Sequence, residues 1–177
     1  MAYGDRNKSI DEGESSERCF AFVMGNRGWK ITSATKQDQF NHIDFFLEKE
    51  GISISVDVKS KKRMSAHDED YLSGWVWVEF AGHAGLKGWL YGGATHIAFH
   101  LEEGFLVVSR GSLVQFCEDK INIDAPSWEW ATESKGAKYR LYRRWSANEG
   151  SSLEKSALIN VVDLKEGIKH KVIHFES

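Results

Sequence analysis

Residues 42–63, HIDFFLEKEGISISVDVKSKKR, predict two short β-strands joined by a tight turn around Lys49–Gly51. Apolar and polar side chains alternate on both arms, which is the period of a strand with one buried face. Two aspartates, Asp44 and Asp57, lie inside the predicted strands, although aspartate is depleted in strands because it prefers to bond nearby backbone in turns. We infer that a requirement other than strand formation placed these carboxylates there.

The side-chain alternation predicts which polar groups meet across this hairpin. On the second strand, Asp57 and Lys59 share the face opposite to the apolar one. If the apolar faces of both strands lie on the same side of the sheet, Asp44 pairs with an odd-numbered residue, Ser55 or Asp57. The two carboxylates and the lysine then converge. Carboxylates that lie so close repel each other unless a cation neutralises them, and their hard oxygen ligands suit Mg²⁺.

The same pattern has a plainer interpretation. It describes an edge hairpin whose polar face is solvated, with Asp57 and Lys59 as mere neighbours. The upstream Asp44, the clean apolar face and an acidic helix before the hairpin favour a catalytic site instead. A lysine beside a metal ion can orient the attacking water and stabilise the charge that develops on a phosphate. The hairpin therefore predicts the equipment for phosphodiester hydrolysis.

Two motifs in this part of the chain resemble those of the PD-(D/E)xK nuclease superfamily, which has the restriction-endonuclease-like fold. HID at 42–44 resembles the half-motif, and VDVKS at 56–60 resembles the D/E-x-K motif. Upstream, GESSER at 13–18 is similar to the G-x-x-x-E-R start of archaeal Holliday-junction resolvases. The sequence departs from the family at Ile43, where the family name has proline, and at Asp57, where glutamate is commoner. Beyond the hairpin we match no particular subfamily.

The resemblance implies a metal-dependent nuclease that hydrolyses DNA. Asp44, Asp57 and Glu17 would bind Mg²⁺, with Mn²⁺ as an alternative, and Lys59 would position or help to activate the water. The implied fold is α/β, with a mixed central β-sheet flanked by helices in α-β-β-β-α-β order and GWVWVEF, residues 74–80, as the third core strand. The implied partners are DNA and a second copy of the chain in a homodimer. Branched recombination or repair intermediates and the DNA of a phage or mobile element are the expected settings.

One histidine and several basic residues are the candidate substrate-binding residues. His42 shares a strand face with Asp44, and the basic run after Lys59 can grip phosphates. Basic and aromatic side chains interleave in KYRLYRRW, residues 138–145, which suits a phosphate track or single-strand stacking. An edge strand protected by its charges is the favoured alternative for that segment. The candidates are His42, Lys61, Lys62, Arg63, Arg140 and Arg144.

The remaining sequence predicts one domain. Residues 1–10 are polar and aperiodic, so we expect a flexible N-terminus before a single nuclease-like domain over residues 11–177. Within it we expect a helix over roughly residues 12–26, a second hairpin over residues 95–110, and a short helix with Ser112 as its N-cap. The end of the chain predicts a mixture of strand and turn. His96 and His100, four residues apart with no third ligand nearby, are expected to be structural.

Composition bounds the class of protein. The chain has 177 residues and a formal net charge of −3. This charge argues against a protein that depends on nonspecific electrostatic binding to nucleic acids. A nuclease stays open, because its own carboxylates lower the total. No apolar run reaches membrane-spanning length and no secretory signal begins the sequence, so we expect a cytoplasmic protein without membrane contact.

Two other functions fit the same residues. A noncatalytic nucleic-acid-binding or interaction protein that keeps the nuclease-like fold would bind DNA, or no nucleic acid, without metal-dependent cleavage. RNA in place of DNA is the other alternative. Metal binding separates the first alternative from a nuclease, and parallel cleavage assays decide the second.

Overall fold

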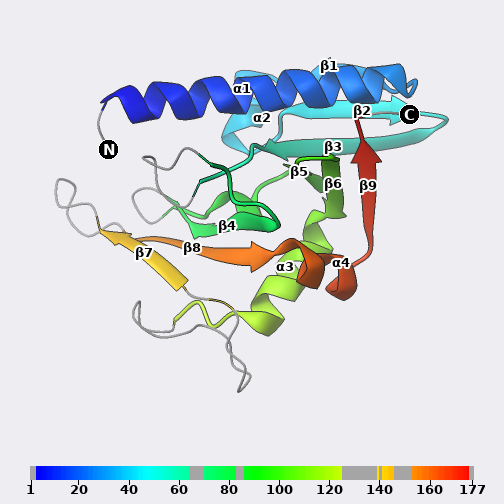
Figure 1. Cartoon of the computed structure of the whole chain (residues 1–177). Helices are drawn as coiled ribbons and strands as arrows, with labels where there is room; N and C mark the ends of the chain where they lie inside the picture. Colours follow the sequence, from blue (N-terminus) through cyan, green and yellow to red (C-terminus); the bar gives the residue numbers. More distant parts are fainter. Residues whose placement is uncertain are drawn as a thin grey trace. The chain divides into compact units, whose positions relative to one another are not determined.

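The computed structural model describes residues 3–63, 70–82, 86–124, 139, 141–145 and 153–175. They form two compact units, each containing segments distant in sequence (Figure 1). The first unit contains Met1–Gly74, Gly93–Ser109 and His170–Ser177, and the second contains Trp75–Gly92 and Arg110–Lys169. Among the described residues no helix is long and apolar enough to cross a membrane. A flexible segment at 1–10 and a single nuclease-like domain over 11–177 stay predictions.

A mixed six-stranded sheet forms the centre of the first unit. The strand order is β1-β2-β3-β5-β6-β9, in which β3 and β5 run parallel and all other neighbours run antiparallel. The coarse prediction of a mixed α/β protein with a mixed central sheet is therefore confirmed. The elements of this unit are α1 (Tyr3–Asn26), β1 (Lys30–Ser33), α2 (Lys36–Phe40), β2 (Phe45–Lys49), β3 (Ile52–Lys59), β5 (His96–His100), β6 (Gly104–Ser109) and β9 (His170–His174).

The predicted hairpin is the pair β2–β3. Its two-residue turn places Glu50 at φ 52° and Gly51 at φ 79°, the left-handed conformation at both positions that matches the twist of the flanking strands. The register aligns Phe45 with Val56, and the Asp44 N–H also donates to the Val56 carbonyl, so Asp44 lies at the open end of the hairpin beside β3. The residue-by-residue register ends at Phe45, so the pairing of Asp44 with Ser55 or Asp57 stays a prediction.

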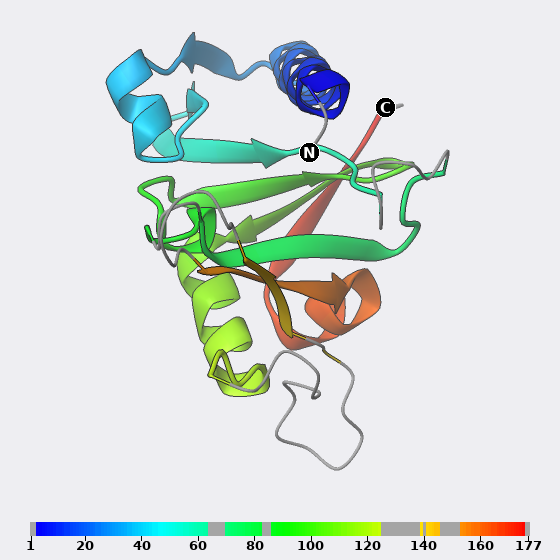
Figure 2. The ribbon, with the colours of Figure 1, turned by 90° about the vertical axis from the view of Figure 1, so that its left-hand side faces the viewer.

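Helix α1 packs its apolar stripe against one face of this sheet. Figure 2 looks nearly along the helix axis and shows α1 beside β3. Phe20 is fully buried, and its ring meets that of Phe105 edge-on at 5.1 Å between centroids. The stripe recurs at helical spacing, which is why the sequence predicted it. The buried residues of this core are Phe20, Val23, Met24, Phe45, Leu47, Val56, Val58, Ala98, Phe105 and Ile173.

The second unit contains a three-stranded antiparallel sheet of order β4-β8-β7. In this unit Asn160 is the N-cap of the helix α4 (Val161–Gly167), because its side-chain oxygen accepts a hydrogen bond from the Val162 N–H at 2.8 Å. The elements of this unit are β4 (Trp75–Ala81), the 3₁₀-helix η2 (Trp89–Tyr91), α3 (Arg110–Lys120), β7 (Leu141–Trp145), β8 (Leu153–Asn160) and α4 (Val161–Gly167).

Several predicted elements differ from the structure. The strand β4 was expected as the third core strand, but it pairs with β8, and the neighbour of β3 is β5. Alternation of residues makes a strand but does not choose its partner, so this prediction was wrong. The helix α3 begins at Arg110, which makes Ser112 a residue of its first turn rather than its N-cap. Helix α1 begins at Tyr3, before the predicted start, and α4 replaces a predicted turn.

Candidate active site

Four of the predicted site residues come together in the first unit. Glu17 comes from α1, Asp44 from the residue before β2, and Asp57 and Lys59 from β3. The Lys59 ammonium lies 2.7 Å from Asp57 Oδ1. Glu17, Asp57 and Lys59 all act electrostatically on the Asp44 carboxyl. We call Glu17, Asp44 and Asp57 the acidic cluster.

Backbone hydrogen bonds fix the position of Asp44. Its N–H donates to the Val56 carbonyl at 2.9 Å, and its own carbonyl accepts from the Ala34 N–H at 2.9 Å. Its side-chain Oδ2 accepts from the Val58 N–H at 2.7 Å. Because the Val58 N–H belongs to β3, the carboxylate is tied to the strand that carries Asp57 and Lys59. The hairpin register therefore sets the geometry of the acidic cluster.

The acidic cluster and Lys59 together carry more negative than positive charge. Burial, and then the charge of Asp57, raise the pKa of Asp44 to about 7, against the hydrogen bond from Val58. The pKa of Glu17 is also raised, first by burial and then by Glu14, while the charge of Lys59 opposes the rise. Three carboxylates thus act on the Lys59 ammonium, and at neutral pH Asp44 is only partly ionised.

The Asp57–Lys59 pair is largely withdrawn from solvent. The side chain of Asp57 is 2% exposed and that of Lys59 is 22% exposed. These residues are two apart on β3, so the strand pleat sends both side chains the same way. A buried carboxylate needs a partner, because an unpaired charge in the interior is costly. Lys59 supplies that partner.

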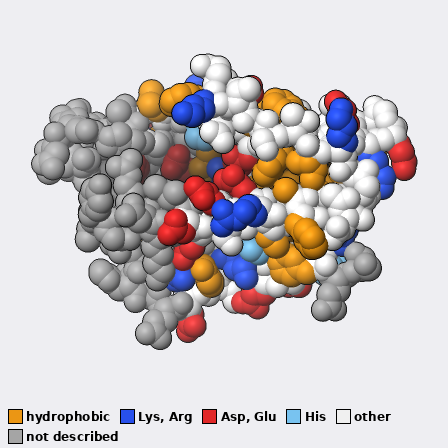
Figure 3. Space-filling model, turned by 90° about the horizontal axis from the view of Figure 1, so that it is seen from above, with side chains coloured by type: hydrophobic (Ala, Val, Ile, Leu, Met, Phe, Trp, Pro, Cys, Tyr) orange, Lys and Arg blue, Asp and Glu red, His pale blue; other side chains and the backbone are white. Residues whose placement is uncertain are grey.

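A cleft of about 620 Å³ opens beside the acidic cluster, between α1 and the β1–α2–β2 segment. Glu17 and Asp44 line it, so two of the three carboxylates border open space. Its volume falls in the range of about 300–1,000 Å³ that small-molecule sites occupy. Figure 3 shows acidic side chains gathered beside basic ones on one face. The cleft lining is Glu14, Glu17, Arg18, Ala21, Ser33, Gln39, Asp44 and Phe45.

The carboxylates suit Mg²⁺ in their chemistry but do not stand ready to coordinate it. Their oxygen atoms are the ligands that Mg²⁺ prefers, and the excess negative charge favours a cation. Within the described part of the chain, however, no group of three or more His, Cys, Asp or Glu side chains is arranged to hold a metal ion. One oxygen of Asp57 is instead engaged by Lys59.

The other candidates near the hairpin lie in different surroundings. His42 lies in the turn between α2 and β2 at φ 56°, and its N–H donates to the Gln39 carbonyl. Arg63 pairs with Glu12 at 2.5 Å. The Lys62 side chain is exposed, whereas Lys61 lines a second pocket with His100. Substrate binding by His42, Lys61, Lys62 and Arg63 stays a prediction.

Of the two C-terminal arginine candidates, Arg144 belongs to the second unit. Arg140 lies outside the described residues. Arg144 is in β7, where the register pairs it with Glu154 of β8, and its side chain is outside the described set. With the order β4-β8-β7, β7 is an edge of its described sheet, as the charge-protected interpretation of this segment expected. A role of these arginines in substrate binding stays a prediction.

Sequence reasoning missed a polar contact between α1 and β5. Ser16 is buried, and its Oγ lies 2.8 Å from Nδ1 of His100. Ser16 lies four residues before Phe20 on the apolar stripe of α1, so helical spacing could have marked it as inward-facing. His100 was expected to be structural, and its contacts with Ser16 and the stacked Phe105 ring agree. His96 contacts Thr95 through Nδ1 at 2.9 Å.

Comparisons with protein-family models, with curated proteins and with solved structures find no match to this chain. The hypothesis about its function therefore depends on the motifs quoted above and on the geometry of the acidic cluster.

Proposed function

We propose that this protein is a metal-dependent nuclease of the PD-(D/E)xK type that hydrolyses DNA phosphodiester bonds. One observation carries the proposal: Glu17, Asp44, Asp57 and Lys59 interact with one another beside a cleft, although they come from three separate segments. The motifs that resemble those of the superfamily contain these same four residues. The finer α-β-β-β-α-β core belongs to the same proposal.

The charge balance of the acidic cluster supports a cation as its partner. A carboxyl whose pKa rises to about 7 ionises at a cost in free energy, and a divalent ion would remove that cost. Asp44, Asp57 and Glu17 would hold the ion, with Mg²⁺ preferred and Mn²⁺ as the alternative. When bound, the ion would neutralise phosphate charge and lower the pKa of a water molecule.

The chain's own residues divide the remaining work. Glu17 and Asp44 border the cleft and would receive the scissile region of the substrate. The Lys59 ammonium, released from Asp57 when that carboxylate takes a cation, would orient the attacking water and stabilise the charge that develops on the phosphate. The Val58 N–H holds Asp44 in place throughout.

Cleavage assays test the proposal directly. Labelled duplex, single-stranded, flap and four-way-junction DNA, with matched RNAs, are incubated with Mg²⁺, Mn²⁺ or EDTA. We expect metal-dependent products from the wild-type protein and a loss of at least about 10²-fold in rate from Asp57→Asn and from Lys59→Met. Absence of products from every substrate would overturn the proposal, and cleavage of RNA alone would replace DNA as the substrate.

Two further variants separate loss of chemistry from loss of folding. Removing only one partner of the Asp57–Lys59 pair leaves a buried charge, which costs about 3–5 kcal/mol of stability. The double variant Asp57→Asn/Lys59→Met removes both charges, so we expect it to stay folded and inactive. Lys30→Met breaks the exposed Lys30–Glu48 pair on β1 and β2 and should keep full activity. Equal activity of the double variant and the wild type would overturn the assignment.

A noncatalytic binding protein is the second candidate function. The observation that favours it is the closed Asp57–Lys59 pair, in which the lysine occupies the carboxylate that a metal ion would need. This candidate predicts no heat of Mg²⁺ or Mn²⁺ binding by calorimetry and no cleavage. Saturable metal binding that Asp44→Asn weakens would exclude it.

A further inference from the structure

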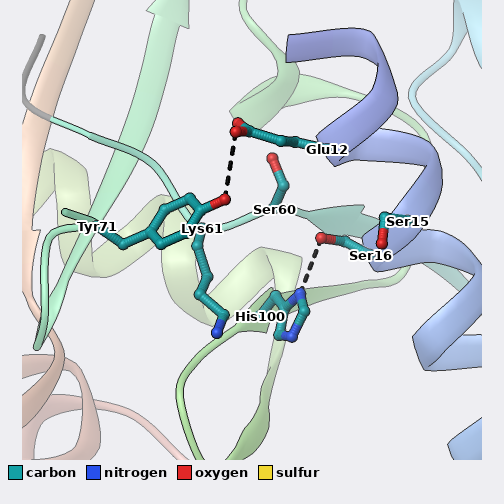
Figure 4. Close-up of a pocket in the computed structure, with 7 residues that line it drawn as sticks. All are labelled: Glu12, Ser15, Ser16, Ser60, Lys61, Tyr71 and His100. Carbon is teal, nitrogen blue, oxygen red and sulfur yellow. Dashed lines mark hydrogen bonds between the residues drawn. The ribbon is translucent and has the colours of Figure 1, made fainter. Parts of the chain in front are cut away.

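A second pocket, of about 180 Å³, lies within the first unit. Its walls come from α1, from Ser60 and Lys61 directly after β3, from Tyr71, and from His100 at the end of β5 (Figure 4). None of these side chains is part of the acidic cluster. Two of them, however, directly neighbour residues of the proposed active site in sequence: Ser16 precedes Glu17, and Ser60 follows Lys59.

One wall of this pocket contains an ion pair whose two charges cancel. The Glu12 carboxylate pairs with Arg63 at 2.5 Å and accepts a hydrogen bond from the Tyr71 hydroxyl at 3.2 Å. The Arg63 guanidinium also lies over the Tyr71 ring, 4.1 Å from its centroid. Glu12 and Arg63 therefore cancel in charge. Because Arg63 covers the Tyr71 ring, that face of the ring is not open to a stacking base.

The remaining polar groups leave the pocket with an uncompensated positive charge. Among the described residues, the Lys61 ammonium makes no ion pair, and its nitrogen lies 5.7 Å from the Tyr71 ring centroid. The hydroxyls of Ser15 and Ser60 also line the pocket without a hydrogen-bond partner in the described part of the chain. One ammonium and two hydroxyls are therefore available as donors in one small space.

His100 adds a neutral ring to the pocket. Its Nδ1 contacts Ser16, whose side chain is buried, and Phe105 stacks on the ring at 4.7 Å between centroids. Burial, and then the charge of Lys61, lower the pKa of His100 to about 4, so the ring is uncharged at neutral pH. The net charge of the pocket therefore comes from Lys61.

The Lys61 ammonium and the two serine hydroxyls together favour the binding of a compact oxyanion. An ammonium surrounded by hydroxyl donors is typical of phosphate contacts in nucleic-acid-binding proteins. The volume of about 180 Å³ is below the range of about 300–1,000 Å³ for sites that hold larger ligands, so a phosphate group fits better than a whole nucleotide. Ser16 and Ser60 are sequence neighbours of Glu17 and Lys59, so α1 and the chain at the end of β3 contribute residues both to this pocket and to the proposed active site.

We propose that the pocket formed by Lys61, Ser15, Ser60 and His100 is a phosphate site that anchors the substrate strand next to the bond cleaved at the acidic cluster. The choice of a nucleic acid as the source of this phosphate rests on the proposed nuclease function. The anion site itself does not. Either an internal phosphodiester or a phosphorylated strand end has the required chemistry.

The first experiment tests the anion site alone. Inorganic phosphate is titrated into the full chain at constant ionic strength, and the imidazole signals of His100 are followed by NMR. We expect a saturable shift of the His100 signals in the wild-type protein, which Lys61→Met removes. The control Lys171→Met, an exposed lysine on β9, should leave the shift unchanged. A wild-type protein without a shift, or a shift that survives Lys61→Met, would overturn the proposal even if the protein proves to be a nuclease.

The second experiment identifies the source of the phosphate. DNA binding is measured by fluorescence anisotropy in EDTA over a range of salt, with 5′-phosphorylated, 3′-phosphorylated and unphosphorylated strands. We expect Lys61→Met to weaken binding about tenfold and to lower the salt slope by about 1, whereas Lys171→Met changes neither. If Lys61→Met weakens the binding of all strands, the pocket holds an internal phosphodiester. If it weakens only the binding of strands phosphorylated at one end, the pocket holds that terminal phosphate. Equal effects of Lys61→Met and Lys171→Met would exclude the pocket as a contact.

The two proposals fail in different ways. A phosphate-dependent shift at His100 in a protein that cleaves neither DNA nor RNA keeps the anion site and rejects the nuclease. Metal-dependent cleavage that Lys61→Met and Ser60→Ala both leave at the wild-type KM keeps the nuclease and rejects the pocket.

Discussion

The Asp44 carboxylate accepts a hydrogen bond from the backbone N–H of Val58 at 2.7 Å. This bond crosses from the residue before β2 to the middle of the D-x-K segment of β3, between Asp57 and Lys59. The backbone thus holds the Asp44 carboxyl in a position that is both buried and close to the Asp57 carboxylate. The energetic cost of that arrangement is measurable without any substrate.

Asp44→Asn should stabilise the metal-free protein at pH 8. The pKa of Asp44 is about 7 in the folded protein, against 3.8 for an ordinary aspartate, so the folded state binds the proton more tightly. Its contribution to the free energy of unfolding therefore falls as pH rises from about 4 to about 7. Asparagine can still accept from Val58 and never ionises. We expect a gain of at most about 4 kcal/mol at pH 8 and no gain at pH 4, by urea unfolding.

Asp38→Asn provides the control of opposite sign. Hydrogen bonds from the Thr35 side chain and backbone lower the pKa of Asp38, so its carboxylate stabilises the folded state above the unfolded pKa. We expect this variant to lose stability at pH 8, with the loss shrinking as pH falls through the folded pKa. A gain in both variants at pH 8 would trace the effect to net charge rather than to the position of Asp44.

Adding Mg²⁺ at pH 8 should raise the thermal midpoint of the wild-type protein. A ligand that binds only the folded state adds about 2.7 kcal/mol at one hundred times its Kd, which corresponds to about 5–10 °C for a chain of this size. Asp44→Asn and Asp57→Asn should reduce the shift, since each removes a proposed ligand. Differential scanning calorimetry with Mg²⁺, Ca²⁺ and EDTA measures it. An equal shift in all three proteins would contradict metal binding at the acidic cluster.

Glu17→Gln should slow cleavage more than Glu14→Gln. Both residues line the cleft on α1, but only Glu17 interacts with Asp57 and Lys59. Glu14 is an exposed residue that pairs with Arg18 at 3.4 Å, so its loss should matter little. We expect at least a roughly tenfold lower single-turnover rate for Glu17→Gln at subsaturating Mg²⁺, partly restored at high Mg²⁺. Equal rates for the two variants would remove Glu17 from the active site.

Gly104→Ala should destabilise the protein by at least about 2 kcal/mol. Gly104 begins β6 at φ 153°, and an added Cβ would overlap the Ile173 carbonyl oxygen on β9. Gly13→Ala is the control, because nothing lies within 4 Å of its added Cβ and alanine favours a helix by about 1 kcal/mol. Opposite signs in urea unfolding are expected. A neutral Gly104→Ala would mean that the β6–β9 junction relaxes around the methyl group.

The local part of the fold was predictable from the sequence because it depends on neighbouring residues. The alternation in residues 42–63 and the turn expected around Lys49–Gly51 predicted the β2–β3 hairpin, and the shared face of Asp57 and Lys59 followed from the pleat. The spacing of Phe20, Val23 and Met24 likewise predicted which side of α1 is buried. These features all result from periods of two or 3.6 residues.

The nonlocal part was not predictable in the same way. The alternation in β4 gave no information on whether it joins β3 or β8, since either partner satisfies its backbone. The same limit applies to the pocket. Nothing in the spacing of Glu12, Arg63 and Tyr71 predicts that the three side chains meet, because the contacts bridge segments about fifty residues apart. The grouping of Glu17 with the hairpin was suggested by the family resemblance rather than by periodicity.

The order in which the sheet strands occur along the chain has a consequence for biosynthesis. Strand β9 forms the edge of the described sheet next to β6, yet sixty residues separate Ser109 from His170, so the ribosome makes β9 well after β6. During translation β6 therefore waits with one row of backbone N–H and C=O groups unpaired, which is the state most exposed to pairing with other chains. Translation slowed between Ser109 and His170, or a chain that stops before His170, should yield aggregates rather than a smaller folded protein.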